Sequence, residues 1–236
     1  RLSVSGNASG YVNDFTFSNI KASSHAGGFS GLGDGHIYGL PKIENTYFDG
    51  NIRNFNLTTD GLSRFVTVWM KKGRLDLSRF AKGYIFNLKG KADGPLNDMK
   101  IHADLSSMIG NAKADIVLSD VISDNPLTLE GVLSTKNMDL GRVLNTKLLG
   151  PATLRTGARA SFGENGIEAR LDSLIVDGLT LNGYNYTGVA AAGTLEKNTF
   201  DGKLICNDPN LSFLFQGSFA LSRKTNNARY QFYANV

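Results

Sequence analysis

The feature that most constrains the fold is a run of alternating residues near the end of the chain. From Leu211 to Leu221 apolar or glycine residues recur at every second position, and mostly small or polar residues stand between them. A period of two is typical of a β-strand with one face turned away from water, because successive side chains of a strand point to opposite faces. This part of the chain is therefore predicted to be a one-sided strand.

A short motif introduces this region and occurs twice more. Phe-Asp-Gly at 200–202 matches Phe-Asp-Gly at 48–50 and Leu-Glu-Gly at 129–131. The spacing indicates a degenerate repeat of about 70 to 80 residues, with motifs near 48–57, 129–140 and 200–211. We interpret Asp49, Glu130 and Asp201, which precede the glycines, as structural and not catalytic. Residues 1–236 are predicted to form a single elongated β-repeat domain, interpreted as a fragment of a longer chain.

Similar patterns cover most of the chain. The clearest one-sided strands are 99–105 and 112–118, and turn signals separate successive strands. Further strands are predicted at 2–20, 84–88, 127–135, 152–162, 166–174, 176–182, 185–195, 200–206, 211–222 and 228–236. Close spacing with intervening turns favours an antiparallel meander. The expected fold class is all-β: an elongated, curled antiparallel sheet, taco- or groove-like, with one or two short helices.

Two segments have helical spacing. Leu62, Phe65, Val66 and Trp69 are separated as i, i+3, i+4 and i+7, and Leu140, Val143, Leu144 and Leu148 follow a related pattern. Asp139 is a suitable N-cap for the second segment. One short helix per repeat is therefore predicted. The alternative is an amphipathic helix that lies on a membrane surface, but a helix of two turns buries little apolar area.

A glycine-dense stretch precedes the first repeat motif. Gly31, Gly33 and Gly35 fall on one face of a predicted strand, and the segment Ile37–Pro41 that follows is not helical in pattern. A dinucleotide fingerprint needs a helix there to receive the pyrophosphate. The glycines are instead expected to keep one face of the sheet bare or to let it curve sharply.

Charge and cysteine content exclude several classes. The net charge is +4, and a basic window from Lys71 to Lys100 is interpreted as a solvated outer sheet face, with a phosphate or anionic-lipid site as the alternative. No RNA-binding aromatic motif accompanies it, so nucleic acid is not expected as a partner. The single cysteine, Cys206, excludes an internal disulfide and is predicted to be a small core residue. No apolar run approaches the ~20 residues of a membrane helix.

No catalytic motif was found. The sequence lacks G-x-S-x-G, H-E-x-x-H and the phosphate-binding loop, and its three histidines share no metal-ligand spacing. His102 is expected to face water, and Asp34 is placed to orient the imidazole of His36, although no nucleophile is nearby. The chain is therefore predicted to be non-enzymatic, without cofactor or metal, and a hydrolase on a β-scaffold is kept as an alternative.

Two segments and the closing aromatic strands carry a family resemblance. The turn Gly94–Met99, which leads into a strand, and the segment Asn137–Leu144 resemble the AsmA-like superfamily, more narrowly its TamB-type translocation and assembly module proteins. The resemblance implies an inner-membrane anchor outside this segment, a periplasmic location, and a long curled sheet with an apolar lining. It also implies transport of phospholipid between the inner and outer membranes, assembly of outer-membrane proteins with a barrel partner, or both.

Alternating residues from four strands are the predicted lining of a lipid groove. They are Leu211, Phe213, Phe215, Phe219, Tyr230, Phe232, Ile101, Leu105, Ile116 and Leu118. Alternation cannot distinguish an open groove from a face that closes on a second sheet as its own core. The competing hypothesis is therefore a structural or adhesive β-repeat module that has a packed core and binds protein or glycan on its outer face.

Overall fold

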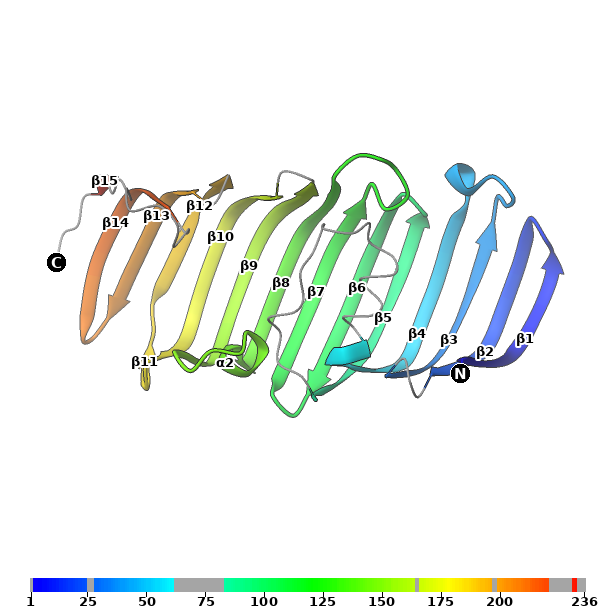
Figure 1. The fold of residues 1–236 in the computed structure, drawn as a ribbon, viewed down its shortest axis with the longest axis horizontal. Helices are drawn as coiled ribbons and strands as arrows, with labels where there is room; N and C mark the ends of the chain where they lie inside the picture. Colours follow the sequence, from blue (N-terminus) through cyan, green and yellow to red (C-terminus); the bar gives the residue numbers. More distant parts are fainter. Residues whose placement is uncertain are drawn as a thin grey trace.

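The computed structural model describes residues 2–24, 28–61, 83–163, 166–196, 199–220 and 231–232. Within them the chain forms one antiparallel sheet in which each strand lies beside the next in sequence (Figure 1). The exception is that β12 pairs with β10, because the short β11 lies off this path and pairs with β10 alone. The strands are β1 (Leu2–Tyr11), β2 (Asp14–Ser24), β3 (Phe29–Tyr38), β4 (Tyr47–Thr58), β5 (Ile85–Pro95), β6 (Asp98–Ser107), β7 (Gly110–Ser119), β8 (Leu127–Asp139), β9 (Leu149–Gly163), β10 (Gly166–Leu181), β11 (Tyr184–Tyr186), β12 (Val189–Glu196), β13 (Thr199–Asp208), β14 (Leu211–Ala220) and β15 (Gln231–Phe232). The predicted all-β antiparallel meander is confirmed.

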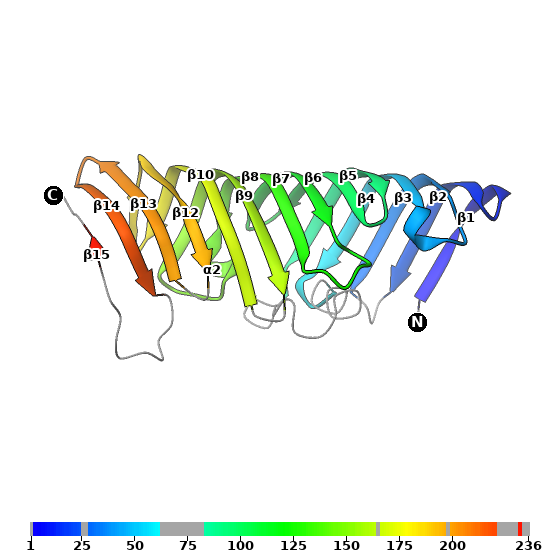
Figure 2. The same ribbon diagram turned by 90° about the horizontal axis from the view of Figure 1, so that it is seen from above.

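The sheet is long, curled and open. Strands β1 and β15 stand at opposite ends of the strand order, so the sheet does not close into a barrel. Figure 2 shows the strands bending about their middles along the length of the molecule. The described residues therefore form a curled single layer, in which each strand is held mainly by its two lateral neighbours.

The two faces of this layer differ in chemistry and in exposure. In β6 and β7 the apolar residues alternate with charged or polar ones, and the apolar positions are half-buried while most of the others are exposed. No second layer among the described residues covers the apolar positions, so their shielding comes from one another, as expected on a concave surface. We call the apolar side the inner face and the opposite side the outer face.

One line of residues crosses the inner face from end to end. Following the antiparallel partners from strand to strand, this central row consists of Ala8, Phe17, Gly35, Gly50, Ala92, Ile101, Ile116, Gly131, Ala158, Leu171, Gly193, Gly202, Gly217 and Phe232. At about 4.8 Å between strands the row is roughly 60 Å long. It contains no polar residue.

The central row explains the sequence repeat. Gly50, Gly131 and Gly202, the glycines of the three motifs, all lie in it. A Cβ on Gly131 would collide with the carbonyl oxygen of Asp115, and one on Gly202 with that of Ala192. One on Gly50 would collide with the Phe48 ring. The motif therefore marks three positions of the central row at which a side chain does not fit.

Irregular register is confined to particular parts of the sheet. Every ladder from β1 to β5 contains a shift, whereas the β5–β6, β6–β7 and β7–β8 ladders are regular. In β2 the extra residue is Asn19, which has a φ of 52°. Shifts reappear in the ladders that join β8, β9, β10 and β12.

Several boundaries differ from the sequence-based expectations. The predicted strands 166–174 and 176–182 form one strand, β10, because bulges and not a turn interrupt its register. The predicted strand 185–195 is divided between β11 and β12. A 3-10 helix, η1 (Ile43–Asn45), was not predicted. The predicted helix from Leu62 to Trp69, and the parts of strand 228–236 other than β15, lie outside the described residues.

The predicted helix near residue 140 forms but is short. Helix α2 spans Leu140–Val143, and the side chain of Asp139 accepts a hydrogen bond from the Arg142 N–H at 2.9 Å, as expected of an N-cap. The helix ends where Leu144 caps it, and Asn145 adopts a φ of 51°. Leu148 is 61% exposed, so the apolar spacing beyond Val143 does not mark a buried helix face.

Candidate apolar binding face

The candidate site is the inner face itself. The central row and the rows beside it across β2–β14 consist almost entirely of aliphatic, aromatic, alanine and glycine residues. Hydroxyl-bearing residues on this face include Thr135 and Thr156 near its middle, and Ser24 and Ser107 toward one edge. Thr135 Oγ1 donates to the Ala152 carbonyl at 3.1 Å, and Thr156 Oγ1 donates to the Ser173 carbonyl at 3.0 Å. The face therefore presents few free polar groups.

Much of this face remains accessible to solvent. Leu133, which lies on the inner face of β8, is 41% exposed, and Leu2 at the β1 end is 64% exposed. The buried apolar side chains among the described residues are few: Ile109, Leu127, Met138, Ala152, Phe162, Val176 and Cys206. Cys206 is thus buried as predicted. A face that contributed the core of a two-layer sandwich would have buried most of its large side chains.

Aromatic rings fill the inner face of β2–β4. The Phe17 and Phe48 rings stack with centroids 6.2 Å apart, and those of Phe29 and Phe55 stack at 5.8 Å. A hollow of about 200 Å³ lies among these strands, and its lining is almost wholly apolar. This region offers a concentrated aromatic surface with space above it.

The glycines of β3 and β4 create the room for these rings. A Cβ on Gly35 would lie 2.5 Å from Phe17 Cζ and 2.7 Å from the Asp49 carbonyl oxygen. One on Gly31 would collide with the Phe55 ring, and one on Gly50 with the Phe48 ring. The glycine-rich face is therefore not bare, because phenylalanine side chains lie across it, an arrangement used to stabilise glycines in sheets.

The predicted lining residues fall into two groups. Ile101 and Leu105 of β6 and Ile116 and Leu118 of β7 are half-buried on the inner face. Ile101 pairs with Ile116, whereas Leu105 pairs with Ala112 and Leu118 with Met99.

The second group lies near the opposite end of the sheet. Leu211, Phe213 and Phe215 of β14 are half-buried and pair with Asp208, Cys206 and Leu204. Phe219 pairs with Phe200 and Phe232 with Gly217 in the ladders, and Tyr230 lies outside the described residues. Strands β8–β13 separate the two groups.

Sequence reasoning missed the aromatic lining of β2–β4. Phe15, Phe17, Phe48 and Phe55 all face inward. The signal was present in the sequence, since inward phenylalanines in β2 and β4 flank the glycine series of β3. It becomes readable only when the register between the strands is known.

The outer face is charged and internally paired. Lys113 Nζ lies 3.1 Å from Asp104, Arg159 lies 3.4 Å from Glu130, and His102 pairs with Asp115. His102 is exposed, as predicted. Of the basic window, Lys89, Lys91 and Lys100 are described and exposed, and residues 71–82 lie outside the described part.

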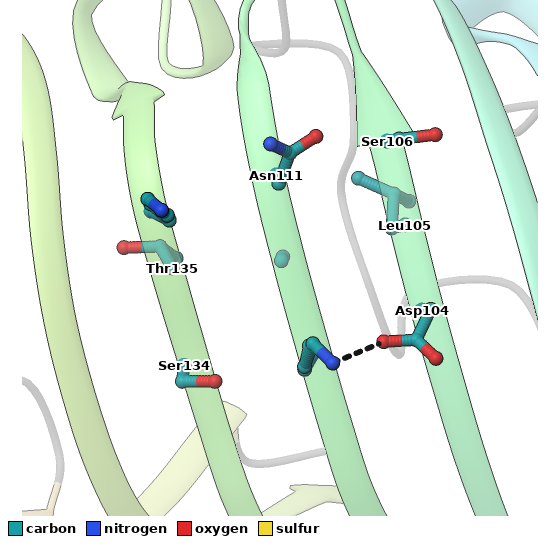
Figure 3. Close-up of a pocket in the computed structure, with 9 residues that line it drawn as sticks. Asp104, Leu105, Ser106, Asn111, Ser134 and Thr135 are labelled. Carbon is teal, nitrogen blue, oxygen red and sulfur yellow. Dashed lines mark ion pairs between the residues drawn. The ribbon is translucent and has the colours of Figure 1, made fainter.

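A hollow of about 340 Å³ lies at one end of β6–β8 (Figure 3). In the figure Asp104, Asn111 and Ser134 point toward the viewer, whereas Leu105 and Thr135 lie on the other side of the ribbon. Two of its charged groups, Lys113 and Asp104, form an ion pair. They do not converge on a shared point where a ligand would sit.

The expected Asp34–His36 pair does not form. His36 Nε2 instead lies 2.6 Å from Asp14 Oδ1 on the neighbouring strand, and both side chains are substantially exposed. Asp34 instead bonds Arg53, whose Nε lies 2.7 Å from Asp34 Oδ2, and accepts the Asn19 N–H at 2.8 Å. Asp34 therefore secures the β2 bulge. No group of three or more metal-ligating side chains occurs in the described part of the chain.

A cluster of hydrogen bonds around Asp208 connects two segments at one edge of the strands near the C-terminal end of the sheet. Asp208 is buried, and its carboxylate accepts hydrogen bonds from the backbone N–H groups of Asn210 and Thr187 and from the Tyr184 hydroxyl. The Asn210 N–H, followed by the other donors, holds the pKa of Asp208 below its ordinary value against the opposing effect of burial. The same bond to Asp208 raises the pKa of Tyr184. This cluster ties the β13–β14 turn to β11.

Comparisons of the chain with models of protein families, with curated proteins and with solved structures found no match. The described residues include no helix long and apolar enough to cross a membrane. Arguments about function therefore rest on the geometry of the inner face and on the resemblance noted in the sequence.

Proposed function

We propose that the inner face carries the acyl chains of phospholipid or other lipids, and that this chain is a non-enzymatic segment of an envelope-biogenesis protein. The observation that carries the proposal is the central row, a line without polar residues that runs across the whole curled sheet. Its length of roughly 60 Å is about twice the ~30 Å hydrocarbon core of a bilayer.

The energetics favour a loosely held apolar cargo. Moving an alkyl chain from water onto an apolar surface contributes up to about 0.8 kcal/mol per CH₂ fully buried, and less on an open face. Tight small-molecule sites add a few converging polar groups that fix the orientation of the ligand. The inner rows lack such converging polar groups among their described residues. Successive positions along the inner face therefore offer a lipid similar apolar contacts. A lipid bound in this way has its acyl chains shielded from water but is not held tightly at one position.

Location and partners follow from the resemblance to the TamB-type proteins. We propose a periplasmic location, an inner-membrane anchor carried by a segment outside this chain, and a barrel partner in the outer membrane. Transport of phospholipid between the two membranes and assistance in assembling outer-membrane proteins are both compatible with an apolar trough, because each cargo has an apolar surface to shield.

The test exploits two adjacent residues of β7 that face opposite sides. Ile116 is half-buried in the central row, and Val117 is 37% exposed on the outer face. Ile116→Asp and Val117→Asp add the same charge one position apart. We expect Ile116→Asp to weaken binding of a fluorescent phospholipid at least about tenfold and Val117→Asp to leave it nearly unchanged, since a buried unpaired charge is disfavoured only where the lipid covers it.

Circular dichroism and thermal unfolding establish that each variant is folded. Ile116→Thr, which replaces an ethyl group by a hydroxyl without adding a charge, serves if Ile116→Asp does not fold. Mass spectrometry of organic extracts of the purified protein reports on co-purified lipid. Protein free of lipid, with no phospholipid binding or with binding equally reduced by both substitutions, would contradict the proposal. That result would favour the competing structural or adhesive β-repeat module.

A further inference from the structure

One long edge of the sheet carries exposed apolar side chains on neighbouring connections between strands. These connections are residues 108–109 between β6 and β7, 140–148 between β8 and β9, and 182–183 between β10 and β11. Met108 is 87% exposed, Leu148 61% and Leu144 45%, and Leu181 and Tyr184 flank the third connection with more than a third of their surface exposed. We call this strip the lower edge, after its place in Figure 1.

Backbone hydrogen bonds hold the three connections side by side. The Asp139 N–H donates to the Ile109 carbonyl at 2.7 Å, and the Asn182 N–H donates to the Leu148 carbonyl at 2.7 Å. At about 4.8 Å between strands, the lower edge is roughly 20 Å long from β7 to β10. Its apolar side chains therefore form one continuous strip.

The two long edges of the sheet differ in charge. At the lower edge Arg142 and Lys147 are exposed, Arg142 pairs with Asp139, and Lys136 is exposed close by, opposite Asn111 at the start of β7. The opposite edge is acidic: its described connections and strand ends carry one basic residue, Lys42, and the carboxylates of Asp14, Glu44, Asp98, Asp120, Asp124 and Glu196.

These properties fit a membrane surface better than a protein partner. A standard protein interface buries about 800 Å² on each side. An edge that is one layer thick, about 10 Å, and roughly 20 Å long offers only about 200 Å². Individual apolar side chains, by contrast, insert among lipid headgroups without a matching surface, and basic side chains are attracted to anionic headgroups. Helix α2 alone is too short for this role, so the three connections must act together.

We propose that the lower edge docks on the surface of a bilayer that contains anionic phospholipid. Met108, Leu144 and Leu148 insert among the headgroups, and the ammonium group of Lys147 lies near their phosphates. The acidic edge faces away from the bilayer, and the central row runs parallel to its surface. The inference goes beyond the proposed function and does not depend on it, because an edge docks whether or not the inner face binds lipid.

The test compares matched residues at the two edges. Leu144→Ser with Leu148→Ser removes apolar side chains from the lower edge, and Ile43→Ser with Ile122→Ser does so at the opposite edge, where Ile43 is 53% and Ile122 48% exposed. Lys147→Glu and Lys42→Glu are the corresponding charge reversals of exposed lysines. Flotation with vesicles of phosphatidylcholine, alone or mixed with phosphatidylglycerol, measures binding, and circular dichroism establishes that each variant is folded.

We expect the wild type to bind the mixed vesicles, and to bind those of phosphatidylcholine alone about tenfold less tightly. The double serine variant of the lower edge should bind the mixed vesicles at least about tenfold less tightly, and Lys147→Glu about tenfold less tightly at low salt. The variants of the opposite edge should stay within about twofold of the wild type, because their positions face away from the bilayer.

Three results would overturn the proposal. The first is a wild type that does not bind the mixed vesicles. The second is equal binding to the two kinds of vesicle, which would show that anionic headgroups are not recognised. The third is an equal response to substitutions at the two edges, which would place the contact with the bilayer elsewhere on the molecule.

Discussion

Strands β2–β4 and strands β6–β8 both contribute to the apolar inner face, but with different kinds of side chain. In β2–β4 phenylalanine rings lie over glycines, and every ladder contains a register shift. In β6–β8 aliphatic side chains such as Ile101 and Ile116 occupy successive inward positions, and the ladders are regular. Both regions expose an apolar surface, but their sensitivity to substitution should differ, because rings that need glycines beneath them leave no room for an added atom.

The largest expected effect is at Gly35 in the aromatic region. Gly35→Ala should destabilise the fold by about 2–3 kcal/mol, because the new Cβ meets the Asp49 carbonyl as well as the Phe17 ring, and backbone cannot move aside cheaply. Gly157→Ala is the matched control, since the nearest atom there is Ser173 Oγ at 3.5 Å. It should change stability by less than about 0.5 kcal/mol. Urea unfolding of both variants checks this, and equal effects would show that glycine is not sterically required at position 35.

Removing one inward side chain from each region is the second comparison. Phe48→Ala should cost about 2 kcal/mol, because it removes a large apolar surface and the stacking on Phe17. Ile101→Ala in the aliphatic region should cost about 1 kcal/mol, since its side chain is smaller and only half-buried. Chemical denaturation of the two variants measures the difference. If Ile101→Ala is the costlier change, the aliphatic region and not the aromatic one is the better-packed part of the face.

The outer-face charges should matter less, and differently in the two regions. Arg53 donates to both Asp34 and Asn19 and thereby holds the β2 bulge, so Arg53→Met should cost about 1 kcal/mol. Lys113 makes a simple exposed pair with Asp104, and Lys113→Met should cost less than about 0.5 kcal/mol. Thermal unfolding at low and high salt distinguishes them, since only a bulge-holding role predicts a substantial loss that persists in high salt.

The last prediction concerns the hydrogen bonds to the Asp208 carboxylate. Their effect on the pH dependence of stability appears only at acid pH. Hydrogen bonds lower the pKa of Asp208 from the ordinary 3.8, so its contribution to stability is complete above that value and is lost as the pH falls through the lowered pKa. We expect the unfolding midpoint of the wild type to fall in this acid range. Asp208→Asn, which cannot titrate, should show a shallower fall. Parallel profiles for the two proteins would mean that other carboxylates dominate the acid response.

Local periodicity was enough to predict the fold class but not the irregular parts. The one-sided strands around Ile101 and Ile116 were predicted correctly because their alternation is uninterrupted. Alternation failed in β10, where bulges resemble a strand boundary, and beyond Val143, where helical spacing continues although the helix ends. The groove-lining role of the predicted residues stays a prediction, although those on β6 and β7, and Leu211, Phe213 and Phe215 on β14, lie on the expected face.

The sequence by itself determined that the chain forms many one-sided strands in a meander, because alternation and turn signals depend on neighbours only a few residues apart. Only the tertiary structure decided that Gly50, Gly131 and Gly202 share one row, that phenylalanines from β2 and β4 lie over glycines of β3 and β4, and that His36 meets Asp14. Each of these depends on the register between strands. Shifting a strand by one residue exchanges its two faces, so relations across strands exist only once the whole sheet has formed.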